Sequence, residues 1–63
     1  MISGFQTAHS IYYVDFRNRT IWGGKLGNRP RPFIQYQMMI GGPGYFLFND
    51  GGQMTTGIIT RYI

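Results

Sequence analysis

The chain has 63 residues, and its six basic and two acidic side chains give a formal net charge of +4. This length predicts one small domain, residues 1–63, and is too short for a Rossmann unit or a TIM barrel. The sequence contains no cysteine, which excludes disulfides and cysteine-based zinc sites, and His9 alone cannot form a histidine site. A domain this small is marginally stable by itself.

No segment approaches the roughly 20 consecutive apolar residues that a membrane helix needs. The first residues lack the basic and apolar regions of a signal peptide. We therefore expect a cytoplasmic protein without a membrane partner. Its small size and unusual composition also permit a virus- or phage-encoded protein, which would act in the host cytoplasm.

The first half of the chain predicts a β-hairpin. Residues 10–16 are rich in β-branched and aromatic side chains, which is typical of a strand. A turn follows at residues 17–19, where Asn18 tolerates a positive φ, and a second strand begins at Thr20. The pair Gly23 and Gly24 indicates a bend in this second strand. The best helical candidate is a short turn at residues 4–9.

The second half predicts an antiparallel meander of three strands. We expect a loop at 27–32, strands at 33–40, 45–48 and 53–62 with a kink at Gly57, and turns at 41–44 and 49–52. The prolines of the first loop exclude regular structure there, and Asp50-Gly51 is a strong hairpin signal.

The expected turns imply a register and therefore a buried face. If Asp50-Gly51 is a two-residue loop, Leu47 lies opposite Met54. The predicted core face then carries Tyr36, Met38, Ile40, Tyr45, Leu47, Met54, Thr56 and Ile58. The opposite face is uncharged and would expose Met39, Phe46 and Phe48. Because exposed apolar patches usually mark an interface, we expect a homo-oligomer that buries these three side chains.

The basic residues are concentrated in one part of the chain. Five of the six lie between residues 17 and 31, and five of the six are arginines, which suit phosphates and stacking on bases. The predicted phosphate contacts are Arg17, Arg19, Lys25, Arg29 and Arg31. A solvated loop or an acidic protein partner would explain the same charges.

The aromatic residues are too many for the core of a 63-residue chain, so roughly half should lie on the surface or at an interface. Tyr13 and Trp22, predicted neighbours across the first hairpin, are the rings that we expect to stack on bases.

Catalytic and cofactor sites are not expected. The acid–base candidates are His9, Asp15, Asp50 and the tyrosines. The turn explains Asp50, an ion pair with Arg17 would explain Asp15, and no second carboxylate is available for acid–base chemistry. We therefore expect no enzyme activity, no cofactor and no metal site.

Two short segments resemble the Sm-like family of small five-stranded barrels that form RNA-binding rings. Residues 10–14 look like a first barrel strand, and residues 52–54 resemble the entry to a late one. The family's Tyr-Lys-His-Ala signature has no counterpart here, where residues 55–58 read Thr-Thr-Gly-Ile. The resemblance carries no site residue over and implies only that a ring of barrels is physically reasonable.

These observations predict an all-β fold: a small, strongly bent antiparallel sheet or an SH3/OB-like barrel of four to five strands. The leading functional hypothesis is a non-catalytic module that binds DNA or RNA. The alternatives are a small protein-interaction module, such as a viral inhibitor of a host protein, and a self-assembling structural subunit.

Overall fold

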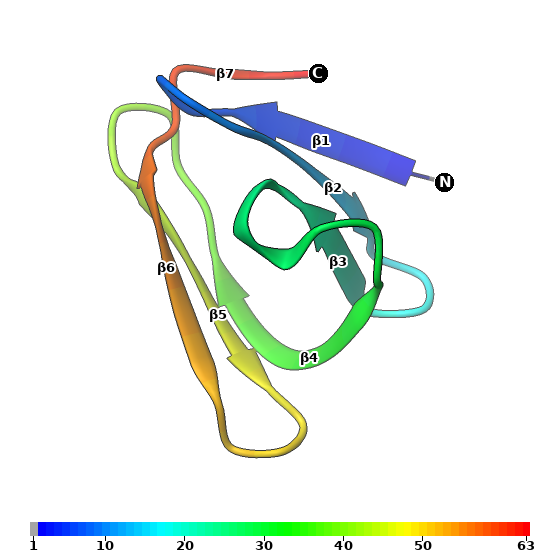
Figure 1. The fold of residues 1–63 in the computed structure, drawn as a ribbon. Coiled ribbons are helices and arrows are strands. Elements are labelled where there is room, and N and C mark those ends of the chain that lie inside the picture. The colour runs from blue at the N-terminus through cyan, green and yellow to red at the C-terminus, as the bar shows by residue number, and fades with distance from the viewer. Residues whose placement is uncertain (1) are drawn as a thin grey trace.

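The protein is described by a computed structural model that covers residues 2–63 (Figure 1). The elements in chain order are β1 (Ile2–Gln6), β2 (Ile11–Asp15), β3 (Thr20–Gly23), a short 3₁₀ helix η1 (Gly24–Leu26), β4 (Arg31–Gln37), β5 (Pro43–Phe48), β6 (Gln53–Ile58) and β7 (Arg61–Tyr62). The all-β prediction is confirmed. The helical candidate at residues 4–9 is not a helix, because residues 4–6 belong to β1 and pair with β2. Over residues 2–63, no helix is long and apolar enough to cross a membrane.

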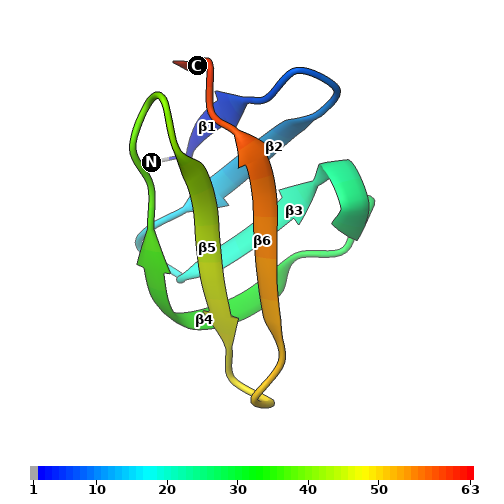
Figure 2. The same cartoon turned by 90° about the vertical axis from the view of Figure 1, so that its left-hand side faces the viewer.

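All seven strands form one antiparallel sheet in the order β6-β5-β4-β3-β2-β1-β7. The sheet bends sharply at β4, so that β5 and β6 lie across the first three strands (Figures 1 and 2). The sheet is not closed, and a barrel of four to five strands is not confirmed. The segment between the edge strands β6 and β7 nevertheless connects the two ends of the sheet, because Ile59 N–H donates to Gly42 O, next to β5, at 2.9 Å and Thr60 N–H donates to Gln6 O in β1 at 2.8 Å.

The β2–β3 hairpin has the predicted position but a different turn. The Asp15 carboxylate accepts hydrogen bonds from the backbone N–H groups of Arg17 and Asn18 and from the Asn18 side chain, at 2.9–3.2 Å. The Asn18 backbone N–H is the main reason why the pKa of Asp15 lies below its ordinary value. The residue with positive φ is Arg19 at 54°, not Asn18. Asp15 is thus explained by the turn rather than by an ion pair with Arg17.

The β5–β6 hairpin is one residue out of the predicted register. Gly51 N–H donates to Phe48 O and Phe48 N–H donates to Gly52 O, which makes a three-residue loop with Gly51 at φ 89°. Phe46 therefore lies opposite Met54, and Leu47 opposite Gln53. A shift of one residue moves every side chain of a strand to the other face.

Because of this shift, Phe46 and Phe48, two of the three residues predicted at the oligomer interface, are wrong. Phe46 and Phe48 face the core and are 0% and 3% exposed, whereas Met39 is 68% exposed. The predicted core face is also wrong at Tyr36, Ile40 and Ile58, which are exposed, and correct at Met54 and Thr56. Met38, Tyr45 and Leu47 are half-buried.

The strand predicted at residues 33–40 also differs from the observed strand in its end and in its pairing. It ends at Gln37, and residues 38–42 form the connection to β5. The pairing with β5 shifts between Phe33 and Gln35, which is a β-bulge. The bulge brings Phe33 and Tyr36 to the same side of the strand, which simple alternation does not allow.

The core joins the two halves of the bent sheet. It consists of Phe5, Tyr12, Val14, Ile21, Phe33, Phe46, Phe48, Met54 and Ile59. Five of the eleven aromatic residues are buried, so more than half of the rings remain at the surface, as the composition predicts. At Gly24 a Cβ atom would collide with the Tyr12 ring, so η1 can pack over this ring only with glycine there.

Candidate nucleic-acid interface

The predicted basic residues have different surroundings in the fold. The Arg31 guanidinium lies 3.8 Å from the centroid of the Phe48 ring and donates to Asp50 Oδ2 at 3.0 Å. Lys25 Nζ donates to the backbone oxygen of Thr55 at 3.3 Å. Both side chains are therefore engaged within the domain. Arg17, Arg19 and Arg29 are exposed, and no hydrogen bond from their side chains is recorded within residues 2–63.

Tyr13 and Trp22 are neighbours across the first hairpin, as the sequence predicts. They form a cross-strand pair, and their rings stack at 6.0 Å with 27° between the planes. The pair lies on the outer face of β2 and β3. Each ring already covers part of one face of the other, so the pair offers less free ring surface than two isolated rings.

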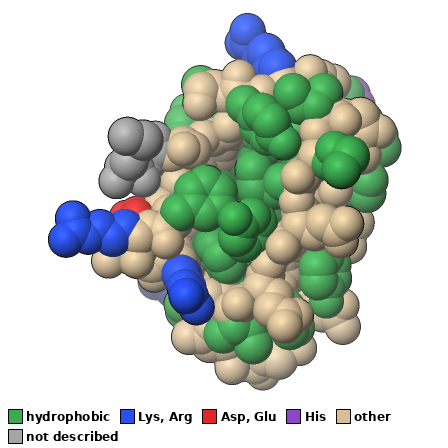
Figure 3. Space-filling model, turned by 180° about the vertical axis from the view of Figure 1, so that it is seen from behind, with side chains coloured by type: hydrophobic (Ala, Val, Ile, Leu, Met, Phe, Trp, Pro, Cys, Tyr) green, Lys and Arg blue, Asp and Glu red, His purple; other side chains and the backbone are tan. Residues whose placement is uncertain are grey.

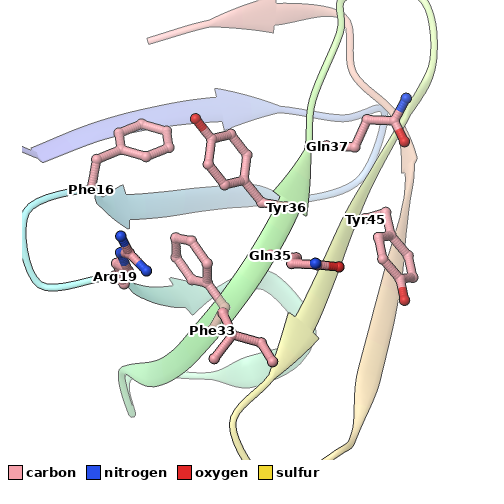
Figure 4. Close-up of a pocket in the computed structure, with 8 residues that line it drawn as sticks. Phe16, Arg19, Phe33, Gln35, Tyr36, Gln37 and Tyr45 are labelled. Carbon is pink, nitrogen blue, oxygen red and sulfur yellow. The ribbon is translucent and has the colours of Figure 1, made fainter.

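A hollow of about 590 Å³ lies elsewhere, around β4 between the β2–β3 turn and Tyr45 of β5. We call it the aromatic hollow; its lining residues are Phe16, Arg19, Phe33, Ile34, Gln35, Tyr36, Gln37 and Tyr45 (Figure 4). Pockets for small ligands typically measure about 300–1,000 Å³. The aromatic hollow is therefore large enough for a group such as a nucleobase.

The aromatic hollow exists because β4 changes partners. Only Arg31 and Pro32 pair with β3, and the last ladder-like bond on that side joins Phe33 N–H to Arg19 O at 2.9 Å. Beyond Phe33, β4 turns away from β3 and pairs only with β5. The gap that opens between β4 and the β2–β3 turn is the hollow.

This change of partner also frees backbone groups. The bond from Phe48 N–H to Gly52 O makes Phe48 and Gly52 a hydrogen-bonded pair, and such pairs alternate along antiparallel strands. Counting along β5, the backbone groups of Tyr45 and Leu47 point towards β4, and those of Phe46 point towards β6. Tyr36, opposite Phe46, therefore directs its N–H and C=O away from β5, to the side on which β4 has no paired strand at this position.

Two exposed rings form one wall of the aromatic hollow. Phe16 and Tyr36 are 37% and 51% exposed, and their ring centroids are 5.1 Å apart with 52° between the planes. Phe33 supports Tyr36 from beneath with an edge-on contact at 5.6 Å. The rings thus meet at an angle on a packed base, rather than covering each other.

Arg19 lies at the edge of the same hollow. It is the one non-glycine residue with positive φ in the part of the chain that the structure describes. This conformation costs a residue with a Cβ about 1 kcal/mol or more, and such outliers concentrate at functional sites. In Figure 4 the Arg19 side chain lies beside Phe33 and below Phe16.

A second, more apolar hollow of about 340 Å³ continues from the first, since Phe16 and Tyr36 line both. Its other lining residues are Ser3, Gly4, Met38, Tyr62 and Ile63. Figure 3, the view from behind, shows hydrophobic side chains gathered around a hollow with basic side chains beside it. The two hollows together form a groove beside β4 with Phe16 and Tyr36 in its middle.

The sequence reasoning missed Phe16, Tyr36, Gln35 and Gln37 as site residues. Strict alternation along the strand predicts Tyr36 in the core, and the bulge after Phe33 makes that prediction wrong. The one available signal is composition: Gln35, Tyr36 and Gln37 form a polar and aromatic run next to an apolar one. The adjoining hairpin turn contains Phe16 between Asp15 and Arg17, which is an unusual place for an aromatic ring.

The candidate residues for a metal or acid–base site lie apart from one another. No three His, Asp or Glu side chains within residues 2–63 lie close enough to hold a metal ion. His9 is exposed in the β1–β2 connection, where it lines a shallow depression with Ala8 and Ser10.

Comparison of the chain with protein-family models, with curated proteins and with solved structures finds no match in any of the three. The likeness of two segments to the Sm-like family is therefore not supported by these comparisons. The function has to be inferred from the geometry of the site.

Proposed function

We propose that the protein is a non-catalytic nucleic-acid-binding module whose site is the aromatic hollow and the turn that carries Arg17 and Arg19. The main support is the position of Arg19, an exposed cation on a strained backbone beside exposed Phe16 and Tyr36. Cations next to exposed rings can hold the phosphate backbone while the rings stack on bases.

The proposal changes the roles of several predicted residues. Arg17 and Arg19 contact phosphates, and Arg29 extends the positive surface along the chain. Phe16 and Tyr36 are the principal stacking rings, with Tyr13 and Trp22 as a secondary platform on the other side of the hairpin. Arg31 and Lys25 are not part of the proposed site, because their charged groups already have hydrogen-bond partners within the domain.

Binding to a fluorescently labelled oligonucleotide of about ten nucleotides, measured by anisotropy over a salt series, tests this function. Because phosphate contacts release counterions, we expect affinity to fall steeply from about 50 mM to about 200 mM salt. Absence of binding to any DNA or RNA at low salt, or affinity that does not depend on salt, would contradict the proposal.

Self-association is a second candidate function, supported by an exposed apolar edge. Met39, Ile40 and Ile58 are 68%, 51% and 53% exposed. They lie together, because Pro43 pairs with Ile58 and the connection from β4 to β5 is bonded to Ile59. Light scattering of the wild-type protein and of Met39→Ser tests this. Dimers that dissociate in the variant would support association, and a monomer at high concentration would exclude it.

We place this function in the cytoplasm, or in the host cytoplasm if the protein is viral, and we assign it no catalytic step. A docking module for an acidic protein remains the alternative in which the same arginines bind carboxylates instead of phosphates. Competition between an oligonucleotide and a glutamate-rich peptide separates these two ligands.

A further inference from the structure

We infer that the aromatic hollow receives one unstacked base of a single-stranded nucleic acid, so that the ligand is single-stranded rather than double-stranded. This inference rests on the proposed function and specifies its ligand. It follows from the shape of the ring pair, from the polar groups around it and from the place of Arg19.

The ring pair leaves ring surface free for a base. Phe16 and Tyr36 meet at 52° and remain 37% and 51% exposed, so they form an open angle instead of a closed stack. Tyr13 and Trp22, in contrast, already stack on each other at 27°. A base that enters the hollow can therefore lie against Phe16 or Tyr36 without first separating two stacked rings.

The hollow also carries groups that can bond to the edge of a base. By the alternation of the ladder, the N–H and C=O of Tyr36 point away from β5 and supply one donor and one acceptor on the side of β4 that has no partner strand. Gln35 and Gln37 also line the hollow, with their side chains on the side of β4 that faces Tyr45 (Figure 4), and neither side-chain amide has a hydrogen bond within residues 2–63. Amides of this kind bond to the edges of unpaired bases in single strands.

Charge places the backbone of the ligand at the margin of the hollow. Arg19 lies beside Phe33 and Phe16 (Figure 4), and Arg17 is two residues earlier in the chain. A base in the hollow would therefore bring its own phosphate close to these arginines. In a duplex the bases are paired and stacked, so their faces and pairing edges are not available to such a site.

The test compares a single strand of about ten nucleotides with a hairpin duplex of the same composition, for wild-type protein and two Tyr36 variants. Tyr36→Leu removes the ring, and Tyr36→Phe keeps it. Tyr13→Leu is the matched control on the other aromatic surface. Circular dichroism confirms that each variant is folded.

We expect the wild-type protein to prefer the single strand. Tyr36→Leu should lower its affinity for the single strand by about 5- to 150-fold, the range for one stacked base, with the salt slope unchanged. Tyr36→Phe should retain affinity, and Tyr13→Leu should weaken binding less than Tyr36→Leu.

Three kinds of failure are distinguishable. If the protein binds single strand and duplex equally well and Tyr36→Leu changes nothing, the inference is wrong although the protein binds nucleic acid. If neither oligonucleotide binds at low salt, the proposed function itself fails. Equal affinity for a glutamate decapeptide, abolished in Tyr36→Leu, would overturn the inference in favour of an extended peptide.

Discussion

The two ends of β4 use the same residue types in opposite ways. At its first residue, Arg31 lies over the Phe48 ring and is bonded to Asp50, so arginine and aromatic ring together seal that end of the core. At the other end, Phe16 and Tyr36 are exposed, and Arg19 lines the same hollow with no hydrogen bond from its guanidinium to residues 2–63. An arginine next to a ring is therefore not in itself a binding site.

The difference arises from pairing. Arg31 and Pro32 are held between β3 and the loop before β6, whereas residues beyond Phe33 have β5 on one side and a gap on the other. One end uses its polar and aromatic groups to hold the fold together, and the other leaves them open to a ligand.

The largest effect is expected from the buried side of β5. Phe46→Ala should destabilise the fold by about 3–5 kcal/mol, because it empties a fully buried position between Phe5, Phe33 and Tyr36. Tyr36→Ala should destabilise it much less, because half of that side chain is already in water. Urea unfolding followed by circular dichroism measures both. Equal decreases in stability would show that the two regions are not different.

The next effect concerns affinity. The double variant Arg17→Ala with Arg19→Ala should lower affinity for an oligonucleotide by about tenfold or more and reduce the salt slope by about 0.7 for each phosphate that the variant no longer binds. Arg61→Ala removes the same kind of charge from β7, where the side chain bonds to Gln6, and is the control. If one Arg61 substitution weakens binding as much as the double variant, only net charge matters.

A pair of substitutions at Arg19 separates strain from charge. Arg19→Gly should raise the free energy of unfolding by about 1 kcal/mol, since glycine adopts positive φ without strain. Arg19→Ala removes the same charge but keeps the strained backbone. Both variants should bind more weakly, and only the glycine variant should become more stable. A glycine variant that is less stable than wild type would contradict the strain argument.

Arg31→Ala is expected to lower the stability of the domain with little effect on its affinity for an oligonucleotide, unlike the Arg19 substitutions. Removal of the guanidinium from the Phe48 ring should destabilise the domain by about 0.5–1 kcal/mol. Affinity should fall no more than in Arg61→Ala, because Arg31 lies outside the proposed site. A larger decrease in affinity would show that Arg31 contacts the ligand and would contradict its exclusion from the site.

The smallest expected effect is a decrease in the stability of the fold at acidic pH. Hydrogen bonds from Asn18 to Asp15 and from Gly52 to Asp50 hold both pKa values below the ordinary 3.8. A lowered pKa in the fold contributes stability that is complete above the unfolded value and is lost as pH falls through the folded value. The melting temperature should therefore decline as the pH falls below 3.8, and less so in Asp15→Asn. An equal decline of the melting temperature in both proteins would show that Asp15 does not contribute to the pH dependence of stability.

The fold class and the first hairpin could be predicted because they depend on local patterns. Residues 10–16 have dense β-branched and aromatic content, which places Tyr13 and Trp22 on neighbouring strands, although their direct pairing depends on a four-residue loop at 16–19 rather than the predicted turn at 17–19. Asp50 and Gly51 likewise indicate the last hairpin. What failed was the length of its loop, three residues instead of two, and this single residue exchanged Phe46 and Leu47 between the faces.

The site could not be predicted in the same way. Its exposed rings depend on the bulge after Phe33 and on the point at which β4 leaves β3, and neither has a local signal in the sequence. The arginines could be found from charge alone. Which of them remain free depends on distant partners, because Arg31 meets Asp50 across 19 positions of the chain.

Amide chemical shifts of the labelled protein during titration with a short single-stranded oligonucleotide at low salt test the central claim most directly. We predict shifts concentrated at residues 16–19 and 33–37, with little change at Arg31, Phe48 and Asp50. Shifts confined to Arg31 and its neighbours, or no shifts at all, would contradict the division between the sealed and the open end of β4.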